Sequence, residues 1–228
     1  MKKSLVHLPE TTIWEKLREP SLTALVIVEA FILFVQKPLG QLNISSAMVN
    51  FIVTLLLIGS ALLVVSGKRL ATIVIVFPTI GVLIADALAV AKPSAAVIYV
   101  DIATKLVFLA TLTGVIGLAV FGPGRVTYHR ILGAIAVYFQ IAMLFAYAYL
   151  LIVLLVPGAF HASKAWSGER LGVIYFSLAT LTTTGYGDIV PIHPIAQSLA
   201  NFEAVIGQLF PAILLARLVS LHASSPKS

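Results

Sequence analysis

Residues Tyr175 to Pro191 read YFSLATLTTTGYGDIVP, and this stretch decides what kind of fold surrounds it. It joins the end of an apolar segment, residues 171–181, to a run rich in threonine and glycine, residues 182–188 (TTTGYGD), called here the Thr/Gly run. The apolar segment is too short to cross a bilayer, which takes about twenty residues of helix. A short apolar segment of this kind is typical of a re-entrant piece, whose backbone is buried in protein or lines a water-filled cavity.

The composition of the chain places this segment in a membrane protein. Of 228 residues, 60% are hydrophobic and 11% are charged, and the mean hydropathy is +1.05, far above that of a soluble domain. Apolar runs of about the length of a bilayer crossing predict six transmembrane helices. These runs are 21–36, 46–66, 70–91, 95–121, 131–156 and 194–221. The absence of cysteine excludes disulfides and thiolate metal sites.

Positive charge is divided unequally between the two sides of a six-span arrangement, which predicts the orientation. One side carries Lys37, Lys92, Lys164 and Arg170. The other carries the larger set: Lys2, Lys3, Lys16, Arg18, Lys68, Arg69, Arg125, Arg130, Arg217 and Lys227. Both termini are therefore predicted to be cytoplasmic, and the re-entrant segment enters from outside. The net charge of +6 reflects this topology and does not indicate nucleic-acid binding.

The Thr/Gly run has the residue types that an ion pathway needs. Rings of backbone carbonyls can replace the hydration shell of a permeant ion. To direct successive carbonyls inward, the chain must adopt torsions closed to residues with a Cβ, which accounts for Gly185 and Gly187. The Thr183 hydroxyl can add a further oxygen at the inner end. Tyr186 would point outward and hold the ring's diameter from behind.

The run resembles the pore loop of potassium channels, whose usual filter is TVGYG. Thr183 occupies the position of the family threonine, Gly185, Tyr186 and Gly187 match, and Thr184 replaces the usual valine. The replacement keeps the β-branch and adds a hydroxyl that needs a partner. The six spans and single loop are similar to the layout of six-transmembrane, voltage-gated-like potassium channels of prokaryotic type.

The resemblance implies an all-α membrane protein with a re-entrant pore helix and a selectivity filter. It also implies a homotetramer in the plasma membrane, since one chain supplies one filter strand. The permeant ion would be K⁺, bound at Thr183, Thr184, Gly185 and Tyr186, with no organic cofactor. No nucleic-acid partner and no cytoplasmic ligand-binding domain are expected.

Other interpretations of the same residues stay open. TTTGYGD is also a composition found in ordinary tight turns. The conducting subunit of a potassium uptake transporter is a competing function, although such chains usually carry four degenerate loops. A non-selective cation channel is another, which loss of a filter glycine would favour. An enzyme is not supported, because the five histidines are scattered and no nucleophile and base lie near each other.

Residues flanking the filter are candidates for its support. Tyr175 and Phe176 occupy positions where relatives carry two aromatic residues that brace the filter, and Tyr175 could donate to Asp188. Packing against lipid or an interface is the alternative for both rings. Ala179 stands where some relatives have a glutamate, so a carboxyl pair is not expected. Residues 167–169 (SGE) predict an N-cap and an acidic first turn for the pore helix.

The last span contains a candidate hinge and gate. Gly207 lies twenty residues after Gly187, where relatives have a flexible glycine, although membrane helices also use glycine for close packing. Pro211 favours a bend. Helical spacing places Pro211, Leu215 and Val219 on one face with Gln208. This face either lines the pore, with an apolar neck that gates by dewetting, or packs on the fifth helix.

The fourth span lacks the arginine at every third residue that a voltage sensor carries. Between 95 and 121 the basic residue is Lys105, and one gating charge supplies only about 2.3 kcal/mol per 100 mV. Little or no voltage sensing is therefore predicted. The intramembrane charges need partners; they are Glu29, Asp86, Asp101, Lys105 and Glu203. Lys105 is expected to pair with Asp101 or Asp86, and Glu203 to lie behind the filter.

The domain organisation follows from these segments. The four-helix domain is expected to pack on the pore domain of its own chain, because the connection GPGRVTYHR is too short for a long linker helix. The predicted units are a cytoplasmic interfacial segment at 1–20, a voltage-sensor-like four-helix domain at 21–121, a linker at 122–130, a pore domain at 131–221 and a tail at 222–228.

Overall fold

The structure is a computed structural model that describes residues 13–36, 46–65, 69–92, 94–122, 128–162 and 170–223. Several predictions concern residues outside these ranges. They are the segment before residue 13, the helix cap at 167–169, the linker residues 123–127 and the tail residues 224–228.

The described chain is mostly helical, as the hydropathy pattern predicts. Its helices are α1 (Ile13–Ala30), η1 (Phe31–Val35), α3 (Ser46–Val65), α4 (Arg69–Ala91), α5 (Ala95–Val120), α6 (Tyr128–Leu155), α7 (Arg170–Leu181) and α8 (Pro194–Ala223). Two short strands complete the set, β1 (Phe160–Ala162) and β2 (Ile189–Pro191). In the described residues, four helices are long and apolar enough to cross a membrane: α4, α5, α6 and Pro194–Arg217 of α8. Three apolar helical stretches of the described residues are shorter: Ser21–Val35, Asn50–Val64 and Gly172–Leu181.

Local sequence accounts for several helix ends. The Ser94 side chain accepts a hydrogen bond from the Val97 backbone N–H at 3.3 Å, which caps the start of α5. Pro194 begins α8, where a missing N–H costs nothing because the first turn has no internal acceptor. Helices α3, α4, α5, α6 and α8 begin and end close to the ends of the corresponding apolar runs.

Two features of the helices differ from the predictions. Helix α1 runs without a break from Ile13, so the boundary placed at residue 20 falls inside a helix. Its continuation, η1, is a π-helix that starts at Phe31. A π-turn widens the hydrogen-bonding pattern by one residue without changing the apolar periodicity enough to be seen in a sequence.

A small antiparallel sheet lies beside the end of the re-entrant loop. Strand β1 pairs with β2 in the register His161↔Val190. The two strands are three residues each and are separated by α7, so neither has a local turn signal that would predict the pairing. The sheet ties the segment before α7 to the chain that follows the Thr/Gly run.

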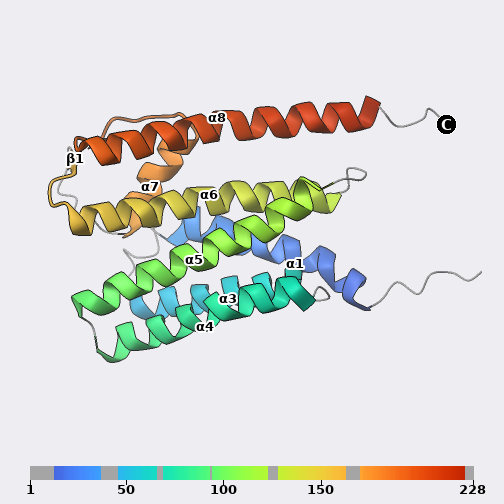
Figure 1. Ribbon diagram of the computed structural model, residues 1–228, viewed down its shortest axis with the longest axis horizontal. Coiled ribbons are helices and arrows are strands. Elements are labelled where there is room, and N and C mark those ends of the chain that lie inside the picture. The colour runs from blue at the N-terminus through green and yellow to red at the C-terminus, as the bar shows by residue number, and fades with distance from the viewer. Residues whose placement is uncertain are drawn as a thin grey trace, which may run out of the picture.

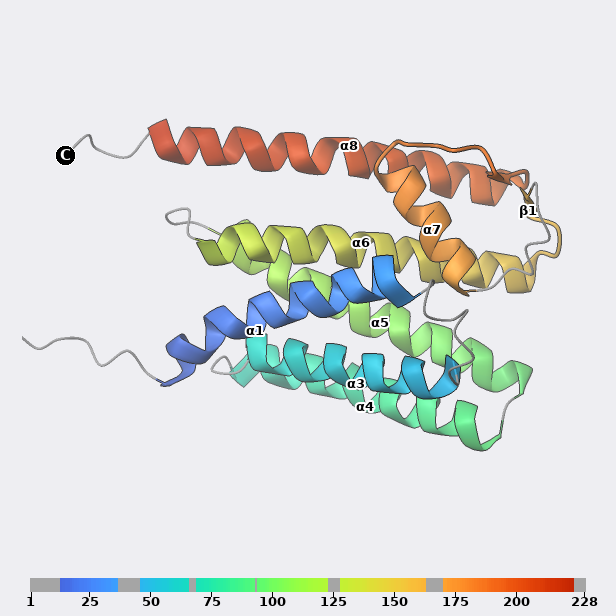
Figure 2. The same ribbon diagram turned by 180° about the vertical axis from the view of Figure 1, so that it is seen from behind.

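The helices pack as one bundle with α6 near its centre (Figures 1 and 2). Helices α1 and α5 both pack on α6 of the same chain, and α3 and α4 pack on the outer side of α1 and α5. The short helix α7 lies between α6 and α8 at an angle to both, as Figure 2 shows. This arrangement holds the Thr/Gly run at one end of α8.

Candidate functional site

The C-terminal end of α7 turns the chain into the Thr/Gly run. The backbone N–H of Thr182 donates to the Leu178 carbonyl at 3.0 Å. The N–H of Thr183 donates to Thr180 at 2.9 Å, and that of Gly185 to Ala179 at 3.1 Å. The last carbonyls of the helix therefore accept from the run itself, which fixes its first residues to α7.

The backbone of the run alternates in handedness. Positive φ angles occur at Thr183 (57°), Gly185 (53°) and Gly187 (76°), whereas Thr184 and Tyr186 are not among the positive-φ residues of the described chain. Such alternation rotates successive peptide planes so that their carbonyls can face one side, unlike in a strand, where they alternate. The sequence predicted such torsions at the two glycines but not at Thr183, because a β-branched residue rarely adopts positive φ. Its strain is typical of functional sites.

The threonine hydroxyls form a short chain beside the backbone. Thr182 Oγ1 donates to the Leu178 carbonyl oxygen at 2.7 Å, and Thr184 Oγ1 lies 2.8 Å from Thr182 Oγ1. Because the Thr182 proton points to Leu178, Thr184 is the donor in the second contact. The hydroxyl added by Thr184 therefore has a partner within the same chain.

The tyrosines on either side of the run lie against each other. The rings of Tyr175 and Tyr186 stack with centroids 5.8 Å apart and planes 8° apart. The Tyr175 hydroxyl also forms a hydrogen bond with the Asp188 carboxylate. Tyr175 thus contacts both the run and the acidic residue that follows it.

Phe176 faces the opposite way from Tyr175. Its ring lies edge-on to Tyr149 at 4.9 Å and to Phe160 at 5.3 Å, between α6 and β1. It is a buried residue. Among the ring contacts of Phe176, none reaches Tyr186 or the threonines in the described part of the chain. Phe176 therefore anchors α7 to α6, and its effect on the run is indirect.

The end of α7 is held closely between α6 and α8. A Cβ atom built on Gly207 would lie 1.8 Å from the Leu181 carbonyl oxygen and 2.6 Å from its carbon. From α6, the Tyr138 hydroxyl approaches the same oxygen at 3.4 Å. Of the two interpretations of Gly207, this contact supports close packing of two backbones, since any side chain would separate them.

The remaining gate candidates lie on a face of α8 that its own chain leaves open. Gln208 and Pro211 are exposed, as are Leu215 and Val219 at 63% and 61%. The face therefore does not pack on α6. By contrast, Glu203 and Gly207 of the same helix are both buried against α7.

The far end of α8 is tied to the end of α5. The Arg217 guanidinium donates to the Gly122 carbonyl oxygen at 2.5 Å and lies 5.5 Å from the centroid of the Phe121 ring. The Phe121 ring contacts Phe210 edge-on at 5.8 Å. Sequence reasoning counted Arg217 only as a topology charge, because nothing in its neighbours indicates a partner ninety-five positions away.

The buried Glu203 lies behind the run, between three helices. It accepts a hydrogen bond from the Tyr149 hydroxyl of α6 at 2.6 Å, and its other oxygen lies 2.5 Å from the Ser177 hydroxyl of α7. Ser177 Oγ also lies 2.7 Å from the Ala142 carbonyl oxygen. The network links α6, α7 and α8 at the level of Ser177.

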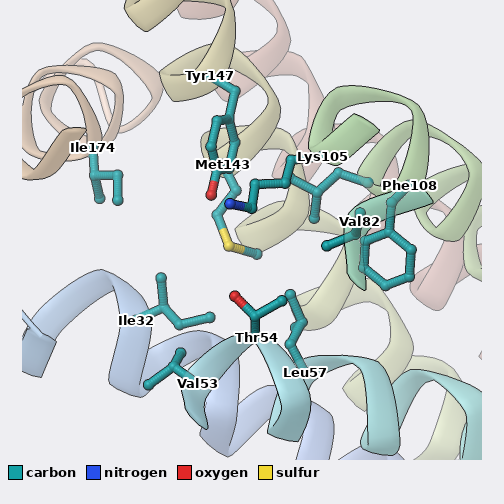
Figure 3. A pocket seen from close by; sticks show the side chains of 11 residues that line it. Ile32, Val53, Thr54, Leu57, Val82, Lys105, Phe108, Met143, Tyr147 and Ile174 are labelled. Atoms are coloured by element: carbon teal, nitrogen blue, oxygen red, sulfur yellow. The ribbon is translucent and has the colours of Figure 1, made fainter. Parts of the chain in front are cut away.

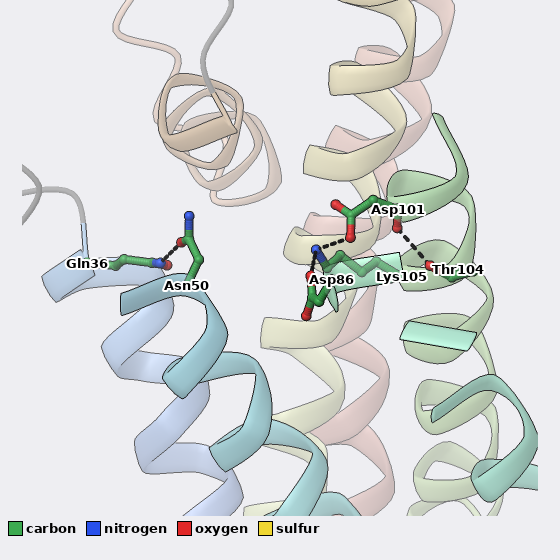
Figure 4. Close-up of polar contacts among 6 residues, drawn as sticks. All are labelled: Gln36, Asn50, Asp86, Asp101, Thr104 and Lys105. Carbon is green, nitrogen blue, oxygen red and sulfur yellow. Dashed lines mark hydrogen bonds and ion pairs between the residues drawn. The ribbon is translucent and has the colours of Figure 1, made fainter. Parts of the chain in front are cut away.

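The other predicted intramembrane charges lie in the four-helix part, which comprises α1 with η1, α3, α4 and α5. The Lys105 ammonium contacts Asp86 at 2.7 Å and Asp101 at 2.5 Å, so it has both of its expected partners (Figure 4). The buried Glu29 accepts from the Gln140 amide of α6 at 2.7 Å. These charges are paired within helices α1, α4, α5 and α6 and do not reach the Thr/Gly run.

A small cavity lies beside Lys105. Its volume is about 30 Å³, and apolar side chains make up most of its lining. The Lys105 ammonium and the Tyr147 hydroxyl point toward each other at its edge, and Ile174 of α7 lies on the far side (Figure 3). The space suits a buried water and is too small for a pathway.

Comparison with known proteins gives a consistent set of relatives. Residues 136–223 match a family model described as an ion channel. The chain is 32% identical to Protein LctB of Bacillus caldotenax over an alignment of 94 residues, which covers 37% of the chain and 68% of that protein.

Two further relatives are named as potassium channels. The chain is 39% identical over 64 residues, 28% of its length, to the two pore potassium channel c of Oryza sativa subsp. japonica. It is 38% identical over 50 residues, 22% of its length, to the inward rectifier potassium channel Kirbac3.1 of Paramagnetospirillum magnetotacticum. The matches span only 14% and 17% of these two proteins. No solved structure matches the chain.

Proposed function

The chain belongs to the ion channel family, and from this premise we propose that it is a potassium-selective subunit, four copies of which surround one pore. The single observation that carries the proposal is the backbone of residues 183–187. Positive φ at Thr183, Gly185 and Gly187 alternates with ordinary torsions at the two residues between them. This geometry suits a row of carbonyls that face one side.

Potassium binding would use the oxygens of this row. Carbonyls of Thr183, Thr184, Gly185 and Tyr186, with the Thr183 hydroxyl at the inner end, would replace the hydration shell of K⁺. The stacked Tyr175 and Tyr186 rings, together with Asp188, would hold the row from behind. The names of the rice and Paramagnetospirillum relatives favour potassium as the ion.

Four copies are required because one chain supplies one side of such a pathway. Residues 182–188 are exposed in the single chain, although each would be costly to leave facing lipid. The open face of α8, with Leu215 and Val219, would line the inner end of the pore and close it by dewetting. Both groups of residues become covered only when copies assemble around a common axis.

The proposed topology has six spans, with both termini in the cytoplasm of a cell whose plasma membrane holds the tetramer. The excess of lysine and arginine on that side supports this orientation. Voltage sensing would be weak, because Lys105 is held by two carboxylates and is the basic residue of α5.

Reconstitution of the purified chain tests the proposal. Liposomes loaded with potassium should release it through the protein when sodium is outside, and the mass of the solubilised particle should equal four chains. Equal release of sodium from liposomes loaded with sodium would support the non-selective cation channel instead. A particle of one or two chains would contradict the shared pore and favour a transporter subunit.

A further inference from the structure

Glu203, Ser177 and Tyr149 meet where α8, α7 and α6 come together, and all three are fully buried. Ser177 lies on α7 two residues before Ala179, whose carbonyl accepts from the Gly185 backbone N–H. A change at Ser177 is therefore close enough to alter the first residues of the filter. The contacts at this junction determine the protonation of Glu203.

The number of protons available decides how the contacts can be satisfied. The Ser177 hydroxyl has one proton and two close oxygens, Glu203 Oε1 at 2.5 Å and the Ala142 carbonyl at 2.7 Å. A carbonyl can only accept, so Ser177 donates to Ala142. The contact with Glu203 Oε1 then needs a proton on the carboxyl, since two acceptors at this distance would repel each other.

With that proton in place, every polar group at the junction is satisfied. Tyr149 donates to Glu203 Oε2, Glu203 Oε1 donates to Ser177, and Ser177 donates to Ala142. Without the proton, the single Ser177 proton can serve only one of the two contacts. Ser177 Oγ then faces either Glu203 Oε1 or the Ala142 carbonyl oxygen with no proton between them, and an unpaired charge is buried as well. Each of these is costly away from water.

No opposite charge compensates an ionised Glu203 in the part of the chain that the structure describes. The titratable groups that face it are the phenols of Tyr149 and Tyr138 on α6. Helix α7 presents the uncharged Ser177. The salt bridges of the described residues join Lys105 to Asp86 and Asp101, in the four-helix part.

We propose that Glu203 is a proton-binding site behind the filter. With its carboxyl neutral, Glu203 is a positioning residue that holds α7 in the conducting arrangement. The inference rests on the proposed channel function. Loss of the proton at alkaline pH breaks the bond to Ser177 and shifts α7, which reduces conduction. Conduction therefore falls as pH rises, and the fall is reversible.

Bilayer recording of the full chain tests the link to conduction. Glu203→Gln keeps the shape of the side chain and, with its amide N–H₂, the donor to Ser177, but it cannot ionise. Wild type should lose most of its open probability as pH is raised on both sides, and E203Q should stay open.

Glu29→Gln is the matched control, because Glu29 is equally buried but forms its hydrogen bond with Gln140 of α6 and not with α7. This variant should keep the wild-type pH profile. A profile in E203Q that matches wild type, or a wild type without alkaline inhibition, would overturn the proposal.

Infrared spectroscopy tests the proton itself, independently of any current. The wild type should show the carbonyl stretch of a protonated carboxylic acid that E203Q lacks and E29Q retains. Ser177→Ala, which removes the acceptor of the proton, should shift that band and serves if E203Q does not assemble. An unshifted band in S177A, or no difference between wild type and E203Q, contradicts the assignment. Because the band is present whichever ion passes, its presence together with failure of potassium selectivity would reject the channel proposal alone.

Discussion

Single residues in the proposed filter adopt backbone torsions that few side chains allow. Gly185 and Gly187 have φ of 53° and 76°, and a Cβ on either would meet no atom within 4 Å in the single chain. Glycine is therefore needed at these two positions for its backbone torsion and not because a side chain would lack space. Thr183 accepts the same torsion at a cost of roughly 1–3 kcal/mol, which the bonds around the end of α7 offset.

Replacing Gly185 and, as a control, Gly158 distinguishes the effect of backbone torsion on conduction from its effect on stability. Gly185→Ala should abolish selective potassium conduction, because a residue with a Cβ disfavours positive φ by roughly 1–2 kcal/mol and the filter relaxes away from it. Single-channel recording measures this. Gly158→Ala is the matched control: Gly158 also has positive φ, at 79°, and open space, but lies in the outer loop. It should reduce stability by a similar amount and leave selectivity intact. Selective conduction by G185A would contradict the account.

The contact at Gly207 predicts a packing role. Gly207→Ala should prevent stable assembly, since its Cβ would overlap the Leu181 carbonyl and the two helices cannot separate without disturbing the filter. Thermal unfolding of the solubilised particle should show a large loss. Gly114→Ala in α5, where a Cβ meets nothing within 4 Å, should unfold like the wild type. A G207A protein that is stable but stays closed would instead favour a hinge.

By the resemblance to the potassium-channel pore loop, Val190, three positions beyond Gly187, would lie at the outer mouth of the pore. Val190 has no aromatic face to offer a cation, and it lies opposite His161 in the β1·β2 sheet. External tetraethylammonium should therefore block weakly. Val190→Tyr should tighten the block by about 0.5–2 kcal/mol through cation–π contact, whereas Val190→Leu should not. Concentration dependence of block measures both, and tight block of the wild type would show that the residue is misaligned.

At the scale of elements, the helices were predictable and their irregularities were not. Apolar runs of bilayer length located α3 to α6 and α8 because length and hydropathy are properties of the segment itself. The π-helix at Phe31 and the pairing of β1 with β2 depend on neighbours distant in the sequence. The same holds for the site. The sequence motif marked residues 182–188 as candidates, but the bonds of Glu203 to Tyr149 and Ser177 could be seen only in the packed helices.

Substitution of Lys105 in helix α5 tests whether this residue is a voltage-sensing charge or part of a structural ion pair. Lys105→Gln leaves Asp86 and Asp101 without their cation and should destabilise the chain by about 3–5 kcal/mol. The slope of conductance against voltage should change little. Unfolding of the solubilised protein and recordings at stepped voltages measure the two effects. Lys92→Gln, at an exposed lysine, should alter neither. A flattened slope with unchanged stability would identify Lys105 as a gating charge.

On the scale of the whole molecule, the four-helix part and the pore part form one packed unit within a chain. Helices α1 and α5 both contact α6 of the same chain, and Arg217 joins the end of α8 to Gly122. Changes in the four-helix part can therefore reach α8 without crossing to another copy. The exposed filter and the open face of α8 are what remain for assembly.

The reversal potential with potassium on one side of a bilayer and sodium on the other tests the central claim most directly. The purified protein should give a reversal potential close to the potassium equilibrium limit, because in the proposed function the carbonyl row of residues 183–187 would replace the hydration shell of K⁺ and not that of Na⁺. Gly158→Ala should give the same value. A reversal potential near zero in the wild type, which indicates equal permeability to the two ions, would contradict the account.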